Sequence, residues 1–238
     1  MLLSEATWPT VPRGGLVLVP VGSLEQHGPH LPLDTDAVIA VAVAAQVATV
    51  CGASVAPPLA YGSSGEHQSF PGTISIGTEV LRLVVVELVR SLRTWAARVV
   101  LVNAHGGNIS GLAAAVQQLR AEGHDVAWAA CATESVDLHA GRTETSLLLH
   151  LDPARVLLDR AEAGDCRPIQ EILPTLVAGG VGAVSANGVL GDPAGASASE
   201  GSDVLAAMVA EVLALIEDGE VDPQGRLRVG APVGGSRR

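Results

Sequence analysis

The sequence predicts an α/β domain whose parallel or mixed sheet is covered by helices on both faces. Short runs of Val, Leu and Ala alternate along the chain with longer segments of helical periodicity. These runs contain few polar residues, as expected for strands that are buried on both faces. Polar residues of the kinds that bind metals or move protons follow three of the runs. They would therefore lie at the carboxyl ends of strands, where such sheets bind their ligands.

Composition favours one large domain. The chain has 238 residues, of which 48% are hydrophobic, so we expect a single domain over residues 1–238. The net charge of -11 argues against nucleic acid or an anionic membrane as a partner. No basic segment opens the chain, and the most apolar stretch, 37–50, is shorter than the about 20 residues that span a bilayer. The three cysteines have no metal-type spacing, so we expect a soluble, cytoplasmic protein.

The expected elements follow from periodicity and from turn residues. Strands are predicted at residues 16–21, 54–59, 98–103 and 125–132. Helices are predicted at residues 37–50, 78–96, 109–122, 143–151 and 199–217. Side-chain oxygens that could cap the first three helices are offered by Asp34, Thr35, Asp36, Thr78 and Asn108.

Three segments carry weaker patterns. Residues 60–77 form a long loop, and a loop of this length within a compact domain is often functional. Between residues 155 and 195, Pro and Gly interrupt the pattern, so we expect loops and a short strand near 181–184. The Gly- and Pro-rich end, 222–238, is expected to be loosely ordered.

Carboxylates and imidazoles follow the first, third and fourth predicted strands. Glu25, His27 and Asp36 follow the first strand, His105 follows the third in a glycine turn, and Glu144 begins the helix after the fourth. Carboxylates together with imidazoles suit Zn²⁺, Mn²⁺ or Fe²⁺. Five protein ligands are too many for one catalytic metal with an open position. They suit two metals that share one carboxylate, and Asp36 is the candidate bridge.

Each of these residues also has an ordinary structural interpretation. Asp36 could cap a helix without any metal, Glu25 could be a solvated loop residue, and His27 could be a hydrogen-bonded turn residue. Their joint placement at strand ends favours the metal interpretation. Glu134 competes with Glu144 for the last ligand position, and we prefer Glu144 because a helix would hold it more rigidly.

The remaining histidines divide into candidates and structural residues. His139 is the candidate for proton transfer to the leaving nitrogen, because amines leave poorly without a proton. His30 could touch substrate or metal, and His67, beside Glu66 in the long loop, is expected to contact substrate or a neighbouring subunit. The structural interpretation is preferred for two histidines near helix ends, His124 and His150.

Three motifs resemble the creatininase family of metal-dependent amidohydrolases. They are Gly-Ser-Leu-Glu-Gln-His-Gly-Pro-His-Leu-Pro-Leu-Asp-Thr-Asp at 22–36, Asn-Ala-His-Gly-Gly-Asn at 103–108 and His-Ala-Gly-Arg-Thr-Glu-Thr-Ser at 139–146. The resemblance extends from about residue 16 to 217. It implies a three-layer α/β/α sandwich with a mostly parallel sheet, two divalent metals per chain and a homo-oligomer, commonly a hexamer. It also implies ligand roles for Glu25, His27, Asp36 and His105.

The chain departs from the creatinine-hydrolysing pattern at Gly107, where that pattern has a glutamate. The departure puts creatinine itself in doubt as the substrate, and Glu144 is the natural replacement for the missing ligand. Two further segments, 61–78 and 188–193, resemble a peptidase branch of the family. That resemblance implies release of a decarboxylated, cross-linked Val-Tyr dipeptide from the C-terminus of a ribosomally made precursor peptide.

Two alternatives remain open at this point. One is hydrolysis of a small cyclic amide or a formamide by a member of the same family. The other is a non-catalytic metal-binding scaffold. The open glycine turn and His139, which is not needed as a ligand, both argue against a scaffold. The native metal is also open, because Zn²⁺, Fe²⁺ and Mn²⁺ all accept such ligands.

The expected mechanism uses both metals and the turns around them. Glu25 and His105 would bind one metal, and His27 and Glu144 the other, so that a shared water reaches a pKa of about 7. Further contacts to the substrate are expected from the backbone amides of Gly106 and Gly107 and from the side chains of His67 and Tyr61.

Overall fold

The computed structural model describes residues 1–132 and 137–229. A four-stranded sheet forms its middle layer in the order β2-β1-β3-β4, and every neighbouring pair of strands is parallel. The strands are β1 (Leu16–Val21), β2 (Ser54–Val55), β3 (Arg98–Asn103) and β4 (Val126–Ala130). The predicted mostly parallel sheet is confirmed.

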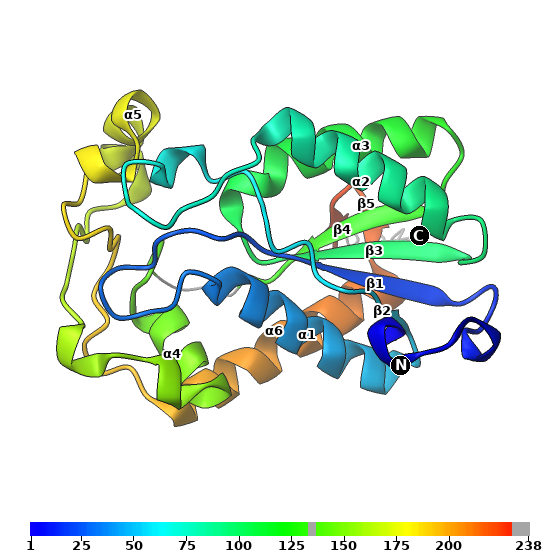
Figure 1. Ribbon diagram of the computed structural model, residues 1–238, viewed down its shortest axis with the longest axis horizontal. Coiled ribbons are helices and arrows are strands. Elements are labelled where there is room, and N and C mark those ends of the chain that lie inside the picture. Colours follow the sequence, from blue (N-terminus) through cyan, green and yellow to red (C-terminus); the bar gives the residue numbers. More distant parts are fainter. Residues whose placement is uncertain (133–136, 230–238) are drawn as a thin grey trace, which may run out of the picture.

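Helices cover both faces of this sheet (Figure 1). One face carries α1 (Thr35–Cys51), α4 (Arg142–Leu151) and α6 (Ala198–Asp218). The other carries α2 (Thr78–Leu92) and α3 (Ile109–Ala121). Successive side chains of a strand point to opposite faces, so Leu18 packs in the first core and Val19 in the second. The predicted three-layer α/β/α sandwich is confirmed.

Several predicted boundaries and caps are wrong. The strand predicted at 54–59 pairs only over β2, because Pro57 and Pro58 cannot donate to a ladder, and one isolated bridge joins Val21 to Leu59. Asn108 does not cap α3. Its side chain accepts a hydrogen bond from Ser63 N and donates one to Gly22 O. It thereby connects the loop that follows β1 with the loop that follows β2.

The segment between residues 155 and 195 contains a helix that the pattern did not predict. This helix, α5 (Ile169–Gly179), has Pro174 in its interior, and a proline there normally predicts a break. The strand predicted at 181–184 is wrong, because residues Val181–Ala183 form a 3₁₀ turn. The chain leaves α5 through Gly180, whose φ of +70° suits glycine, and a Cβ there would lie 2.5 Å from Glu66 O. The end of α5 therefore packs directly against the long loop.

The C-terminal segment is ordered as far as it is described. β5 (Glu220–Val221) pairs antiparallel with β6 (Leu227–Arg228), and Leu227 is buried in the core. The expected loose tail therefore does not extend to residues 222–229, and residues 230–238 lie outside the described part. No helix within the described residues is both long and apolar enough to cross a membrane.

The parallel register brings the functional motifs to one edge of the sheet. Val21 at the end of β1 pairs with Asn103 at the end of β3, and Asn103 pairs with Ala130 at the end of β4. The loops that follow these three strands therefore start side by side. This edge is where α/β sheets place their ligands.

Candidate metal centre

Asp36 lies at the centre of a buried cluster of carboxylates and imidazoles. It stands in the first turn of α1, and its side chain is 2% exposed. Oδ1 lies 3.1 Å from His27 Nε2, and Oδ2 lies 3.3 Å from His105 Nδ1. Oδ2 also accepts a hydrogen bond of 2.7 Å from Ser23 Oγ. Each oxygen of Asp36 thus faces a different histidine, as the two oxygens of a bridging carboxylate would.

Two groups of three candidate ligands share Asp36. Glu25 and His105 complete one group, and His27 and Glu144 complete the other, with the ligand atoms of each group within 4.8 Å of one another. Glu25 Oε2 lies 3.2 Å from His105 Nε2, and Glu144 Oε2 lies 3.9 Å from His27 Nε2. The structure therefore brings together all five candidate ligands, and these two groups contain the pairs that the sequence predicts. A third group of possible ligand atoms joins Glu25, His27 and His139. Their role as ligands stays a prediction.

The hydrogen bonds of His27 and His105 orient their second ring nitrogens toward Asp36. His27 Nδ1 donates to Glu25 O at 3.1 Å, and His105 Nε2 donates to Ser63 O at 3.1 Å. A carbonyl oxygen only accepts, so each ring carries a proton on that nitrogen. The other nitrogen of each ring then faces an oxygen of Asp36. Metal-binding histidines use the same arrangement, in which the second ring nitrogen donates to a fixed acceptor.

The charge balance of the cluster fits a cation. Both carboxylate oxygens of Glu25 are buried, and neither has a hydrogen-bond partner among the described residues. Burial works against a charge on His27, but the charge and hydrogen bond of Asp36 dominate and raise its pKa to about 10. Burial likewise opposes a charge on His105, yet Asp36 and Glu25 raise its pKa well above the usual range. The carboxylates keep protons on two buried imidazoles, so the cluster carries the negative charge that a divalent metal ion would balance. These residues therefore fit a divalent metal.

Glu144 is the ligand candidate with the most exposed side chain, at 22%. Its Oε2 accepts a hydrogen bond of 2.6 Å from Ala140 N, which holds the carboxylate toward the cluster. Burial raises the pKa of Glu144 to about 7, while the charge of His27 opposes that rise. Its rival Glu134 lies outside the described residues, so the choice between the two stays a prediction.

A second pair of histidines lies beside the first. The ring of His139 lies 4.3 Å from that of His27 and 4.4 Å from that of His67, between centroids. His139 Nε2 donates to Gln26 O at 2.8 Å, and its Nδ1 lies 3.8 Å from Glu25 Oε1. Burial lowers the pKa of His67 to about 4 and, aided by the charge of His27, that of His139 to well below its usual range. His139 is therefore neutral near pH 7, and its Nδ1 faces the cluster.

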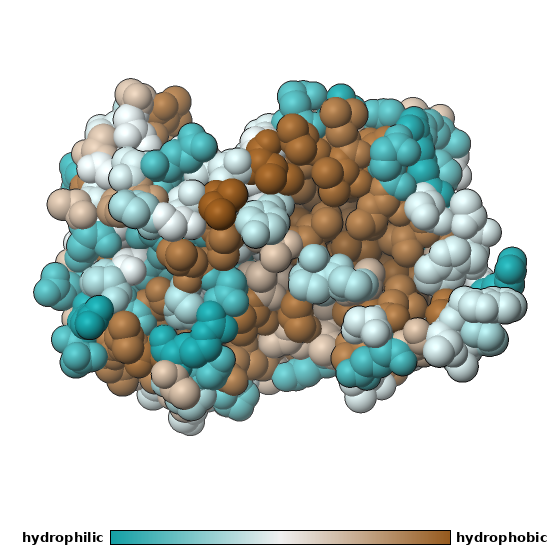
Figure 2. All heavy atoms as spheres, viewed as in Figure 1, coloured by the Kyte–Doolittle hydropathy of each residue, from teal (hydrophilic) through white to brown (hydrophobic). Residues whose placement is uncertain are grey.

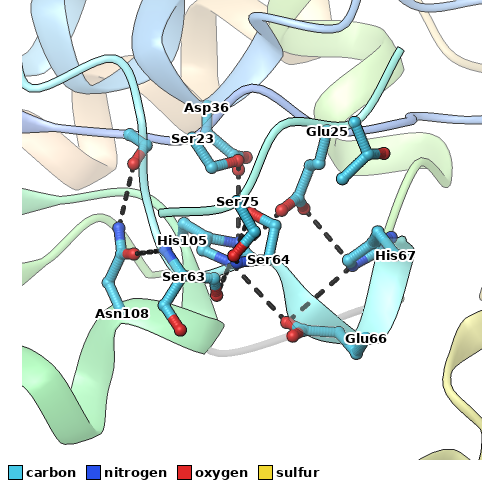
Figure 3. Close-up of polar contacts among 12 residues, drawn as sticks. Ser23, Glu25, Asp36, Ser63, Ser64, Glu66, His67, Ser75, His105 and Asn108 are labelled. Atoms are coloured by element: carbon cyan, nitrogen blue, oxygen red, sulfur yellow. Dashed lines mark hydrogen bonds and ion pairs between the residues drawn. The ribbon is translucent and has the colours of Figure 1, made fainter. Parts of the chain in front are cut away.

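The long loop between β2 and α2 covers the cluster. Figure 3 shows the Ser63 carbonyl, the Ser64 hydroxyl and the Glu66 carboxylate of this loop next to His105. Glu66 Oε1 lies 3.6 Å from His105 Nε2 and 4.0 Å from His67 Nε2. A cavity of about 420 Å³ opens beside it, lined by Gly65, Glu66, Ser69, Leu176, Val177, Gly179 and Gly180. Glu66 thus stands between the cluster and an open cavity.

The glycine turn is open at one residue and filled at the next. A Cβ at Gly106 would meet nothing within 4 Å, whereas one at Gly107 would lie 2.6 Å from Glu66 Oε1 and would also meet Ser63 O. Space for a substrate beside this turn is therefore at Gly106. At Gly107 the loop fills the space that a side chain would take.

The other candidates lie outside the cluster. Tyr61 is 49% exposed, and its contact with substrate stays a prediction. His30 is buried, but its Nε2 contacts Thr145 Oγ1 at 2.9 Å. His124 lies 3.7 Å from Glu122 at the end of α3, and His150 lies exposed in the last turn of α4.

Sequence reasoning did not single out Gln26 or Ser23. Gln26 lies between two ligand candidates, and its side chain contacts both His67 and His139. Ser23 holds one oxygen of Asp36. The available signal was position alone, since both residues stand within the loop that follows β1.

Comparisons with known proteins show which proteins this chain resembles. The profile of the family described as Creatininase, creatinine amidohydrolase, matches residues 4–216. A mycofactocin precursor peptide peptidase of Mycobacterium ulcerans is 53% identical over 93% of this chain and 90% of its own length. That of Mycolicibacterium smegmatis is 55% identical over 82% of this chain and 81% of its own. A mutant creatininase of Zn-Zn type superposes with a TM-score of 0.76 and 29% identity, covering 91% and 96% of the two chains.

Proposed function

This chain belongs to the creatininase family of metal-dependent amidohydrolases, and we propose that it is a peptidase that matures the mycofactocin precursor peptide. The bond cut would be the amide that joins the decarboxylated, cross-linked Val-Tyr end to the rest of the precursor. The observation that carries the proposal is the shared carboxylate Asp36 between two ligand groups, in a chain more than half identical to relatives named for this reaction.

The ligand groups indicate where metals would be held. We propose two divalent ions per chain, Zn²⁺ or Fe²⁺ with Mn²⁺ also accepted: one held by Glu25 and His105, the other by His27 and Glu144, with Asp36 shared. When bound, such a pair lowers the pKa of water and polarises an amide carbonyl. The chain's own contribution is a buried, preorganised ligand set whose histidines are oriented by backbone carbonyls.

His139 is the proposed proton carrier. Its Nε2 is held by Gln26 O, so Nδ1 is free to accept a proton from the attacking water and to give it to the leaving nitrogen. The leaving group is then a neutral amine, and the new carboxylate stays on the shortened precursor. The backbone amide of Gly106 is the proposed donor from the glycine turn, because this residue has open space beside it.

The substrate would approach through the cavity beside Glu66. This cavity of about 420 Å³ has apolar side chains of α5 on one side and the long loop on the other. An open cavity suits the end of a peptide, whereas a small cyclic amide would be better held by an enclosed pocket. The creatinine-hydrolysing pattern has a glutamate at the position of Gly107. A Cβ at Gly107 would lie 2.6 Å from Glu66 Oε1, so the Glu66 carboxylate occupies the space of that side chain.

The test is mass spectrometry of the modified precursor peptide incubated with this protein, with and without a chelator. We expect release of the modified dipeptide that stops on chelation and returns on addition of Zn²⁺ or Fe²⁺. Creatinine and a formamide serve as competing substrates, because a creatinine amidohydrolase of Pseudomonas putida is 35% identical over 67% of this chain. Hydrolysis of either small amide without peptide cleavage would overturn the proposal. A metal-binding scaffold would show no metal-dependent turnover.

A homo-oligomer in the cytoplasm is part of the proposal. Figure 2 shows apolar side chains gathered over α2 and the part of the molecule beside it. Val80, Leu83 and Val84 of α2 are each between 38% and 52% exposed, and Ile74 before this helix is 50% exposed. An apolar patch of this kind suits contact with a second copy. Light scattering of the purified chain measures whether a hexamer forms, and Leu83→Glu should shift it toward smaller species.

A further inference from the structure

The side-chain amide of Gln26 has a single orientation. Gln26 is 5% exposed, its Oε1 accepts from Gly28 N at 2.9 Å, and its Nε2 donates to Gly188 O at 3.0 Å. If oxygen and nitrogen were exchanged, a donor would face the N–H of Gly28 and an acceptor would face the carbonyl of Gly188. The amide therefore presents Nε2, with one proton still unassigned, to its surroundings.

That proton has two possible acceptors, and one of them is excluded. His67 Nδ1 lies 2.9 Å from Gln26 Nε2, and His139 Nε2 lies 3.0 Å from it. His139 Nε2 already gives its proton to Gln26 O at 2.8 Å, so it carries hydrogen and cannot accept. The proton of Gln26 therefore goes to His67 Nδ1. A neutral imidazole that accepts at Nδ1 carries its own proton on Nε2.

His67 thus faces the cluster with an N–H donor. Its Nε2 lies 3.4 Å from Glu25 Oε1 and 4.0 Å from Glu66 Oε1 (Figure 3). Glu25 belongs to the ligand cluster, and Glu66 lines the open cavity. The N–H group therefore lies at the boundary between the predicted metals and the proposed path of the substrate.

We propose that Gln26 is a positioning residue that holds His67 in the Nε2–H tautomer, and that this N–H donates to the oxygen of the scissile amide as charge develops on it. The second half of this inference rests on the proposed function. No proton is transferred in this step, since the bond strengthens as the carbonyl oxygen becomes negative and weakens when the carbonyl reforms.

Gly188 supplies an independent reason for this use of Gln26. Its φ of +81° favours glycine, and a Cβ at this position would lie 2.5 Å from Gln26 Cδ and would also collide with Gln26 Oε1. The same residue accepts the hydrogen bond from Gln26 Nε2. Gly188 therefore provides both the space and the acceptor that fix the amide. This gives a physical role to the first residue of segment 188–193, which the proposed reaction does not otherwise use.

The tautomer can be measured directly. Long-range ¹H–¹⁵N spectra of the Zn²⁺-loaded, ¹⁵N-labelled protein distinguish a protonated from an unprotonated ring nitrogen, and comparison with His67→Leu assigns the His67 signals. We expect the Nε2–H signature for His67 in the wild-type protein and a mixture of tautomers in Gln26→Met. A wild-type His67 protonated on Nδ1 would overturn the inference.

Kinetics and metal content separate a donor from a ligand. We expect His67→Leu to lower kcat on the precursor peptide by about 10²–10³-fold, with KM changed less than about threefold and full metal content. His67→Gln keeps an N–H donor and should recover a large part of kcat. Loss of metal in His67→Leu would make His67 a ligand or a support of Glu25, and an unchanged kcat would remove its catalytic role. If the wild-type protein does not cleave the peptide, the proposed function fails, while the NMR signature still decides the role of Gln26.

Discussion

Two pairs of histidines share one buried site and behave in opposite ways. His27 and His105 have raised pKa values, about 10 for the first and well above the usual range for the second. His67 and His139 have lowered ones, about 4 for the first and well below the usual range for the second. Burial opposes the charged form in all four rings. The difference therefore comes from their neighbours rather than from burial.

The neighbours differ in kind. The first pair faces Asp36, which contacts one ring with each carboxylate oxygen. In the second pair, His67 faces the side-chain amide of Gln26 and His139 faces its backbone carbonyl. Both rings also lie near Glu25 Oε1. One pair is therefore arranged to share a positive charge with carboxylates, and the other to remain neutral with one fixed proton. Within a few ångströms, the same residue type thus has two opposite electrostatic environments.

Asp36→Asn should have the largest effect, because it removes the carboxylate that distinguishes the two pairs. We expect the protein to lose most of both metals and turnover to fall by about 10³-fold or more, since both groups share this ligand. Metal analysis and peptide cleavage measure the two effects. Asp34→Asn is the matched control, because Asp34 pairs with Arg155 at the surface and should keep its metals. Full metal content in Asp36→Asn would contradict the bridging role.

A pair of variants tests the division between ligand and proton carrier. Glu144→Gln should lower metal content, because a neutral amide binds a divalent ion more weakly than a carboxylate. His139→Ala should keep its metals and slow turnover by about 10²–10⁴-fold, the range that general acid–base groups supply. If Glu144→Gln retains both ions, then Glu134 or water completes the metal shell. If His139→Ala loses an ion, the second pair is not distinct from the first.

The sequence could predict the five ligand candidates and their pairing, because each follows a strand whose carboxyl end is recognisable. Parallel pairing makes the loops that carry Glu25 and His105 start side by side. It could not predict Gln26, because the value of that residue lies in a contact 162 residues away with Gly188. Nor could it predict that Glu66 fills the space at Gly107, since the path of the long loop depends on packing against α5. Helix α5 was not predicted because Pro174 lies in its interior, where a proline normally indicates a break.

The pH dependence of stability gives a smaller effect that the first pair should cause between pH 7 and 9. Above this range the Cys131 thiol, whose pKa burial raises to about 12, also contributes. In the metal-free protein the folded pKa of His27, about 10, lies above the unfolded value of 6.5. Its stabilisation is fully present below pH 6.5 and is lost as the pH rises through about 10, and His105 acts in the same direction.

Urea unfolding of the metal-free protein between pH 7 and 9 measures this effect. We expect the midpoint to fall steadily across this range in the metal-free protein. With Zn²⁺ bound, the ring nitrogens of the first pair carry metal instead of protons, so the midpoint should stay level. The lowered pKa of His67 contributes only below about pH 6.5, outside this window. A level midpoint in both forms would show that His27 is not protonated in the metal-free protein.

The smallest effect is expected at His30, which shows that a buried histidine of this motif can have a structural role alone. It belongs to the same sequence motif as His27 and is equally buried, yet it faces a hydroxyl instead of a carboxylate. Thr145 Oγ1 donates to Gly141 O, so it must accept from His30 Nε2–H, and this bond joins the loop after β1 to the first turns of α4. His30→Leu should therefore lower the free energy of unfolding by about 1 kcal/mol, the net value of one such hydrogen bond. His30→Gln, which keeps a donor, should lose less. Both variants should retain full metal content and wild-type kcat, and a loss of metal in either would extend the ligand-supporting shell to this residue.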